Sequence, residues 1–161
     1  MLIDLSAPPA RTGPRPATTG VAIPHDQLEQ FSPPDVREEL IAQVEAMDGV
    51  FTGPSQVSDP RSLAFRVREP RGPWEAFLTP TRDEFGHVHT SGFLHLMLPL
   101  QVITVLAEAG WVEMHPITRR PDFPDTAVMF YAPRDHDELA VALAAIRASL
   151  AHAAGTGFIR T

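Results

Sequence analysis

The sequence predicts a single-domain α+β sandwich, in which a mainly antiparallel sheet packs against about three helices. The length of 161 residues and the apolar content of 43% suit one domain with one core. Apolar and polar residues alternate in short segments that are bounded by turn residues, as in antiparallel strands. A helical spacing of apolar residues occurs in other segments, so helices and strands are segregated along the chain.

The N-terminal region, residues 1–22, is predicted to be a flexible, proline-rich arm. Four prolines between positions 8 and 16 stand among small residues, which bury too little apolar surface to offset the entropy of ordering. We expect this arm to be available for docking a second subunit in a homodimer. The folded domain is expected over residues 23–154, followed by a tail over residues 155–161.

The first helix is predicted to follow Ser32-Pro33-Pro34-Asp35, because prolines and an acidic residue favour a helix N-terminus. Val36, Leu40 and Val44 then recur at helical spacing, and Gly49 ends the pattern. Four strands are predicted next, at residues 62–68, 73–79, 85–89 and 93–98, with a turn through Pro80 and a hairpin loop at Thr90-Ser91-Gly92.

Two helices and two strands are predicted for the C-terminal half. Residues 100–109 are apolar, lack glycine and end before Gly110, as a buried helix does. Strands are predicted at residues 111–115 and 126–131. The last helix is predicted to begin after Asp135, which can cap it while Glu138 reaches back to complete a capping box.

The composition excludes several classes of protein. A formal charge of −7 argues against nucleic-acid binding, which needs a concentrated cationic surface. The absence of cysteine and lysine excludes thiolate nucleophiles, cysteine-ligated metals and Schiff-base chemistry. No window has the ~20 apolar residues of a membrane span, and the N-terminus lacks a signal-peptide pattern. We therefore expect a cytoplasmic protein that binds no membrane.

Three histidines fall within nine residues. His87 and His89 share one face of a strand, because side chains alternate across the pleat. A three-residue loop at 90–92 places His95 directly opposite His87, within ~5 Å between β carbons, whereas a loop of even length sends it to the other face. This cluster favours a functional site over isolated structural histidines.

Further candidate residues lie on the strands that follow. Trp111, Glu113 and His115 are expected on one face of residues 111–115. Arg134 either pairs with an acidic loop or presents a fixed guanidinium fork to an anion. The remaining histidines are assigned no role; they are His25, His136 and His152.

Three motifs occur in order along the chain: HVHTSGFLHLMLP (87–99), GWVEMHP (110–116) and TAVMFYAPRDHDEL (126–139). Together they resemble the luciferase-like domain of fungal luciferase and of bacterial proteins. The resemblance implies a small bacterial tailoring enzyme of secondary metabolism, acting without a cofactor on an aromatic, pyrone or polyketide-like molecule, by oxygenase, cyclase or decarboxylase chemistry.

Such chemistry needs a base, a group that holds the enolate, and a dry pocket for a small-molecule substrate and O2. The resemblance implies His87, His95 and His115 as candidate bases and Arg134 as the group that holds the anion. The residues expected to contact substrate are His89, Phe93, Trp111, Glu113 and Tyr131.

Two other classes of function stay open at this point. Three imidazoles with an open position are a catalytic metal arrangement, so His87, His89 and His95 are alternative ligands for one divalent metal such as Fe or Zn, completed by Glu113 or His115. The acidic surface and the proline-rich arm also suit a non-catalytic binding or assembly module.

Overall fold

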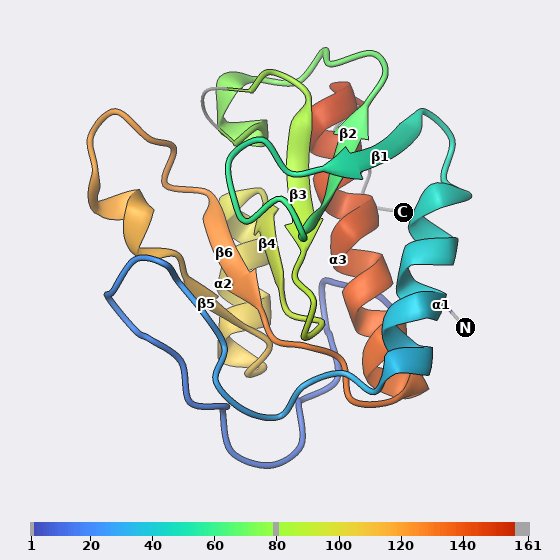
Figure 1. The fold of residues 1–161 in the computed structure, drawn as a ribbon, viewed down its shortest axis with the longest axis vertical. Coiled ribbons are helices and arrows are strands. Elements are labelled where there is room, and N and C mark those ends of the chain that lie inside the picture. Colours follow the sequence, from blue (N-terminus) through green and yellow to red (C-terminus); the bar gives the residue numbers. More distant parts are fainter. Residues whose placement is uncertain (1, 79–80, 157–161) are drawn as a thin grey trace.

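A computed structural model describes residues 2–78 and 81–156, and within them the chain forms three α-helices and six strands (Figure 1). The helices are α1 (Pro34–Glu45), α2 (Leu100–Glu108) and α3 (His136–Ala154). The strands are β1 (Val50–Pro54), β2 (Leu63–Val67), β3 (Glu84–Val88), β4 (Leu94–Met97), β5 (Val112–Met114) and β6 (Ala127–Phe130). No helix in the described part combines the length and apolar character needed to cross a membrane.

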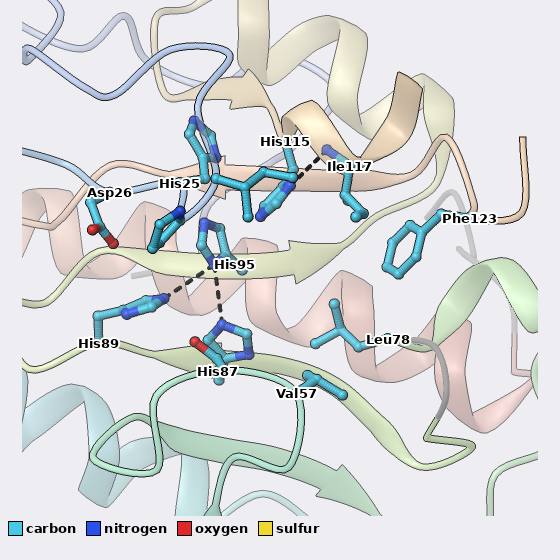
Figure 2. A pocket seen from close by; sticks show the side chains of 13 residues that line it. His25, Asp26, Val57, Leu78, His87, His89, His95, His115, Ile117 and Phe123 are labelled. Carbon is cyan, nitrogen blue, oxygen red and sulfur yellow. Dashed lines mark hydrogen bonds between the residues drawn. The ribbon is translucent and has the colours of Figure 1, made fainter. Parts of the chain in front are cut away.

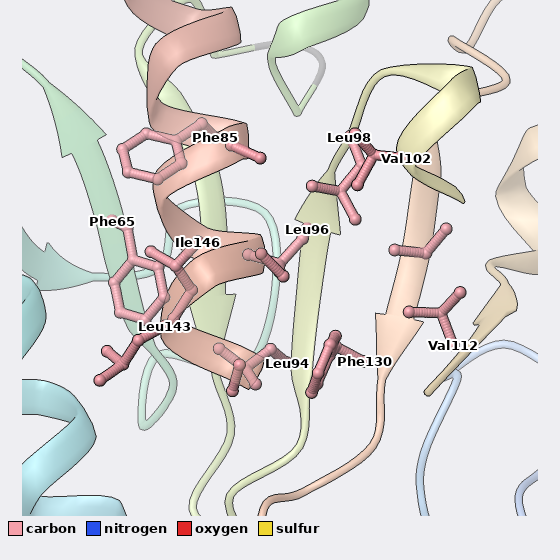
Figure 3. Close-up of a cluster of buried hydrophobic side chains, with 14 of the residues drawn as sticks. Phe65, Phe85, Leu94, Leu96, Leu98, Val102, Val112, Phe130, Leu143 and Ile146 are labelled. Atoms are coloured by element: carbon pink, nitrogen blue, oxygen red, sulfur yellow. The ribbon is translucent and has the colours of Figure 1, made fainter. Parts of the chain in front are cut away.

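The six strands form one antiparallel sheet in the order β1-β2-β3-β4-β6-β5. The helices and this sheet enclose one main hydrophobic core, to which α1, α2 and α3 all contribute. Figure 3 shows side chains of β2, β3, β4 and β6 meeting those of α2 and α3. Phe65, Leu96 and Phe130 point into that core, where Leu143 and Ile146 of α3 meet them. The predicted α+β sandwich is confirmed.

One predicted strand is wrong and one strand was missed. The region predicted as a strand at residues 73–79 forms a short 3-10 helix at Trp74–Ala76. Pro73 precedes this tight turn, and Phe77 N donates to Trp74 O at 3.2 Å at its end. Thr79 and the predicted turn at Pro80 lie outside the described residues. β1 escaped prediction because it ends in Gly53-Pro54, residues that only an edge strand accepts readily.

The cap of α3 is confirmed, but the capping box is wrong. Asp135 accepts a hydrogen bond from Glu138 N at 2.8 Å, as expected of an N-cap. The Glu138 carboxylate accepts from the backbone N–H of Arg134 at 3.0 Å and from its guanidinium, at 2.6 Å from Nη2. In a capping box the Glu138 carboxylate would accept from the N–H of Asp135. Here it binds Arg134, the residue before the cap, instead.

Residues 2–22, predicted as a flexible arm, run beside the edge strand β5 and the end of α2 (Figure 1). Arg11 N donates to Ala109 O at 2.8 Å, and Arg15 Nη1 donates to Val112 O at 2.9 Å. Polar contacts with backbone carbonyls, together with Leu5, which is buried in the main core, connect this segment to its own domain. They also cover the open side of β5, which would otherwise expose unpaired backbone groups. Of the predicted tail, residues 157–161 lie outside the described residues.

Candidate functional site

A cavity of about 360 Å³ lies over the face of the sheet that points away from the helices. Five of the seven histidines line it, together with apolar side chains from loops on that face (Figure 2). The lining residues are Ile23, Pro24, His25, Asp26, Val57, Ser58, Leu78, His87, His89, His95, His115, Ile117 and Phe123. Its size suits a small organic ligand.

The predicted register of the β3–β4 hairpin is confirmed. His87 is paired with His95 across the two strands, and the loop between them is closed by His89 N to Phe93 O at 2.9 Å and Gly92 N to His89 O at 3.0 Å. Gly92 has φ of +100°, and a Cβ there would lie 2.2 Å from Ser32 Oγ. Glycine is therefore required for the turn that brings the two histidines together.

Three imidazoles of this hairpin are joined through one nitrogen atom. His95 Nδ1 lies 3.1 Å from His87 Nε2 and 3.1 Å from His89 Nε2 (Figure 2). His89 is held in turn by Ser62 Oγ at 3.2 Å from its Nδ1, and by Phe93, whose ring stacks on it at 4.0 Å between centroids. The three predicted histidines thus form a cluster with a fixed geometry.

A buried carboxylate stands behind this cluster. Glu84, which is fully buried, places Oε2 2.9 Å from His87 Nδ1 and accepts from Ser55 Oγ at 3.1 Å. When the Glu84 carboxylate accepts this hydrogen bond, His87 donates from Nδ1, and in the neutral ring its Nε2 carries a lone pair. In this tautomer the lone pair accepts from His95 Nδ1–H, 3.1 Å away, and the order of groups is Glu84, His87, His95. We call these three residues the relay.

The relay leaves His95 Nε2 as a lone pair. This atom is buried and has no hydrogen-bond partner among the described residues. A buried imidazole nitrogen without a donor carries a free-energy cost, which a ligand that donates a proton or accepts an electron pair removes. His95 Nε2 is therefore the atom of the cavity wall that can accept a proton or a hydrogen bond from a ligand.

His25, which was assigned no role, faces His95 from the N-terminal segment. The two rings are stacked with centroids 5.4 Å apart. Its Nε2 lies 2.9 Å from Glu113 Oε2, and its Nδ1 is also buried without a partner in the described chain. Although burial alone would raise it, hydrogen bonds from His25, Tyr131 and Thr18 hold the pKa of Glu113 below its usual value. Glu113 is therefore an acceptor, and in the neutral His25 ring Nδ1 is a second lone pair.

His115 completes the group from the end of β5. Its ring centroid lies 4.6 Å from that of His95 and 4.8 Å from that of His25. Its Nδ1 accepts from Ile117 N–H at 3.0 Å, so in the neutral ring Nε2 carries the hydrogen. His115 is therefore a donor beside two acceptors.

Burial keeps these imidazoles neutral. Burial first, and then the neighbouring His87, lowers the pKa of His89 to about 3. The pKa of His95 falls well below its usual value for the same two causes. Burial, followed by His25, lowers the pKa of His115 to about 4. At neutral pH the cavity thus offers unprotonated nitrogens.

The structure does not bring every predicted contact residue to the cavity. Phe93 lies under His89, while Glu113 and Tyr131 lie behind His25, where Tyr131 Oη donates to Glu113 Oε1 at 3.0 Å. All three support histidines rather than line the cavity. Trp111 stacks on Phe130 in the core, with ring centroids 5.9 Å apart.

The predicted shared face of Trp111 and His115 is wrong. Gly110, with φ of +90°, turns the chain directly before Trp111, which lies just before β5 and packs its ring on Phe130 in the core. Its Nε1 donates to Pro9 O at 2.7 Å, on the segment that covers the sheet edge. Trp111 is therefore a core residue.

Arg134 does not line the cavity. Its guanidinium forms a bidentate ion pair with Glu138 and donates to Thr12 O at 2.8 Å. Of the two alternatives, the structure places it with the structural one, although the partner lies on α3 rather than on an acidic loop.

Two sets of three histidines hold ring nitrogens within 4.8 Å of one another, which is close enough to share a metal ion. One set is His87, His89 and His95, the ligands predicted from sequence. The other is His25, His95 and His115. In the first set the nitrogens already pair with each other, whereas the second contains both unpartnered lone pairs.

An antiparallel sheet with helices on one face and a buried imidazole cavity on the other defines a small, enzyme-like α+β domain. Residues 82–149 match the model of the Luciferase domain family, so this part of the chain is similar to that family. This confirms the family resemblance, and the match includes four of the five cavity histidines.

Curated relatives agree with the family. The chain is 28% identical to a luciferase of Armillaria gallica over 169 residues, and 27% identical to luciferases of Armillaria mellea and Armillaria ostoyae. Each alignment covers 89% of this chain and 60% of the relative. The chain thus spans about 60% of the length of the curated relatives it matches. No solved structure matches it significantly.

Proposed function

We propose that this chain is an enzyme that removes an acidic proton from a small organic molecule at His95, and that the resulting enolate reacts with O2 without an organic cofactor. The observation that carries the proposal is the unpartnered His95 Nε2 in the cavity wall, backed by the relay. The curated fungal relatives are named luciferases, and the oxygenase chemistry that the family resemblance implies is consistent with this proposal.

The relay gives His95 its role as the base. When Nε2 takes a proton, the positive charge is stabilised through Nδ1–H and His87 by the Glu84 carboxylate, as in other carboxylate–histidine pairs. A base with a lowered pKa removes only acidic protons, so the substrate is expected to carry an enol or phenol-like hydroxyl.

His115 and the apolar walls support the later steps. His115 Nε2–H can donate to the oxygen on which negative charge develops. Val57, Leu78 and Phe123 keep the cavity apolar, which favours O2 over water. In the net reaction the enolate carbon is oxidised, O2 is reduced by two electrons as the C–O bond forms, and the proton on His95 passes to the outer oxygen. The product is a hydroperoxide with the composition of substrate plus O2.

The test uses tag-free protein with a panel of enolisable pyrones and phenols, under air and under nitrogen. We expect substrate loss, O2 uptake and a product heavier by O2 under air, and a loss of about 100-fold or more in kcat for His95→Gln. His136→Gln, an exposed histidine on α3, is the matched control and should retain activity. Turnover that is equal under nitrogen would remove the oxygenase step and leave a cyclase or decarboxylase.

A further inference from the structure

We propose that His25, His95 and His115 form a binding site for a transition-metal ion of the Zn²⁺ class, and that metal binding and proton removal by His95 exclude each other. This inference is independent of the substrate. It rests on the two unpartnered nitrogens, His25 Nδ1 and His95 Nε2, which belong to residues whose ring nitrogens approach within 4.8 Å.

The surroundings of two ligands fit a metal site. A histidine that binds a metal usually donates its other N–H to a carboxylate, which fixes the ring and its tautomer. His25 does so directly to Glu113, and His95 does so to Glu84 through His87. These hydrogen bonds fix which ring nitrogen carries the lone pair in His25 and in His95. One cation can bind both nitrogens.

The ligand types select the metal. Three neutral imidazoles without a thiolate suit Zn²⁺, Cu²⁺, Ni²⁺ and Co²⁺ rather than Mg²⁺ or Ca²⁺, which prefer oxygen. Three protein ligands leave a fourth position of a tetrahedral ion open to the cavity.

His115 is the weaker third ligand. Its Nδ1 is occupied by Ile117 N–H at 3.0 Å and its Nε2 carries the hydrogen. Coordination through either nitrogen breaks the bond to Ile117, because Nδ1 either binds the metal or takes up the proton that leaves Nε2. Loss of His115 should therefore weaken the site less than loss of His25 or His95.

The experiment titrates chelator-treated, tag-free protein with Zn²⁺ in the absence of substrate, by calorimetry or chelator competition. We expect one Zn²⁺ per chain, a loss of at least about 100-fold in affinity for His25→Gln, and a loss of about 10-fold for His115→Gln. His136→Gln, at an exposed position of α3, is the matched control and should stay within about threefold of the wild-type affinity. His89→Gln separates the two sets, because this residue belongs only to the other one, and it should cost less affinity than His25→Gln. Circular dichroism checks the fold of each variant.

A second measurement needs no variant. Substoichiometric Cu²⁺ should broaden the side-chain NMR signals of His25, His95 and His115 more than that of His89 in the wild-type protein. Absence of binding, or binding that depends on His89 and not on His25, would overturn the site.

The enzyme proposal fails separately. If Zn²⁺ binds and inhibits turnover, the shared lone pair is supported. If Zn²⁺ binds at His25 and His95 and activates turnover, the metal site is supported. The claim that metal binding and proton removal exclude each other is then overturned, together with the role of His95 as a base. If turnover occurs and no metal binds, the base stands and the site is overturned.

Discussion

Glu84 and His87 lie three residues apart on β3, yet their side chains meet on the same face of the sheet, with 2.9 Å between Oε2 and Nδ1. In a regular strand, residues three apart point to opposite faces. A β-bulge resolves this, because Phe65 pairs with Gly86 whereas Arg66 pairs with Glu84, which leaves Phe85 as an extra residue on β3. The bulge turns Glu84 toward the cavity and creates the relay.

The variant Glu84→Gln tests the relay. It keeps the size of the side chain but removes the charge that stabilises protonated His95, so kcat should fall by about 10- to 100-fold with little change in KM. Steady-state kinetics on the substrate found above gives both values. Glu75→Gln, on the 3-10 helix outside the cavity, is the control. Unchanged kcat in Glu84→Gln would mean that the carboxylate only fills a buried position.

The low pKa values of the cluster predict a loss of stability in mild acid. Unfolded histidine has a pKa of ~6.5, whereas those of folded His89 and His115 are about 3 and about 4, so only the unfolded chain binds these protons between pH 6.5 and 4. The free energy of unfolding is therefore complete above pH ~7 and falls as the pH decreases, by up to ~1.4 kcal/mol per pH unit for each histidine.

Urea unfolding of chelator-treated protein between pH 7.5 and 4.5 measures this slope. The variant His89→Gln should show a shallower slope than the wild type, since one of the titrating groups is gone. A free energy that stays constant from pH 7 to pH 5 would contradict neutral, buried imidazoles.

Two glycine substitutions test the hairpin turn. Gly92→Ala should lower the free energy of unfolding by more than ~1 kcal/mol, because φ is positive and the new Cβ meets Ser32 Oγ at 2.2 Å. Gly20→Ala is the control, since Gly20 also has positive φ, at +62°, but nothing lies within 4 Å of its Cβ position. Denaturant unfolding compares the two. Equal losses would show that only the backbone conformation matters at Gly92.

Arg134→Ala should destabilise the fold. The substitution leaves Glu138, only 5% exposed, without its bidentate partner, and removes the bond to Thr12 O, at a cost of about 1–3 kcal/mol. The midpoint of thermal unfolding measures the effect. An unchanged midpoint together with lost turnover would instead restore Arg134 as the group that holds the anion.

Strong local patterns explain why much of the fold could be predicted. The spacing of Val36, Leu40 and Val44 placed α1, and the cap at Asp135 placed the start of α3. A three-residue loop fixed the pairing of His87 with His95. Each of these depends on residues close together in sequence.

The missed parts of the site depend on contacts between distant segments or on an irregular strand. Glu84 could not be assigned, because the pleat places it opposite His87 and no local pattern reveals the bulge. His25 could not be assigned either, because its partner Glu113 lies 88 residues away. The sequence places His25 at the start of the predicted domain, outside any predicted helix or strand, so no local pattern connects it with the other histidines.

The five cavity histidines divide between two parts of the chain. His87, His89, His95 and His115 come from the region that matches the family, whereas His25 comes from the segment before it, together with Ile23, Pro24 and Asp26 of the cavity wall. Protein engineers can therefore treat residues 19–26, which a bridge between Thr18 and Gln27 closes, as an exchangeable cover. Grafting different sequences there changes which molecules enter the cavity and whether a second lone pair faces His95. The hydrogen bonds among Glu84, His87 and His95 do not involve this segment.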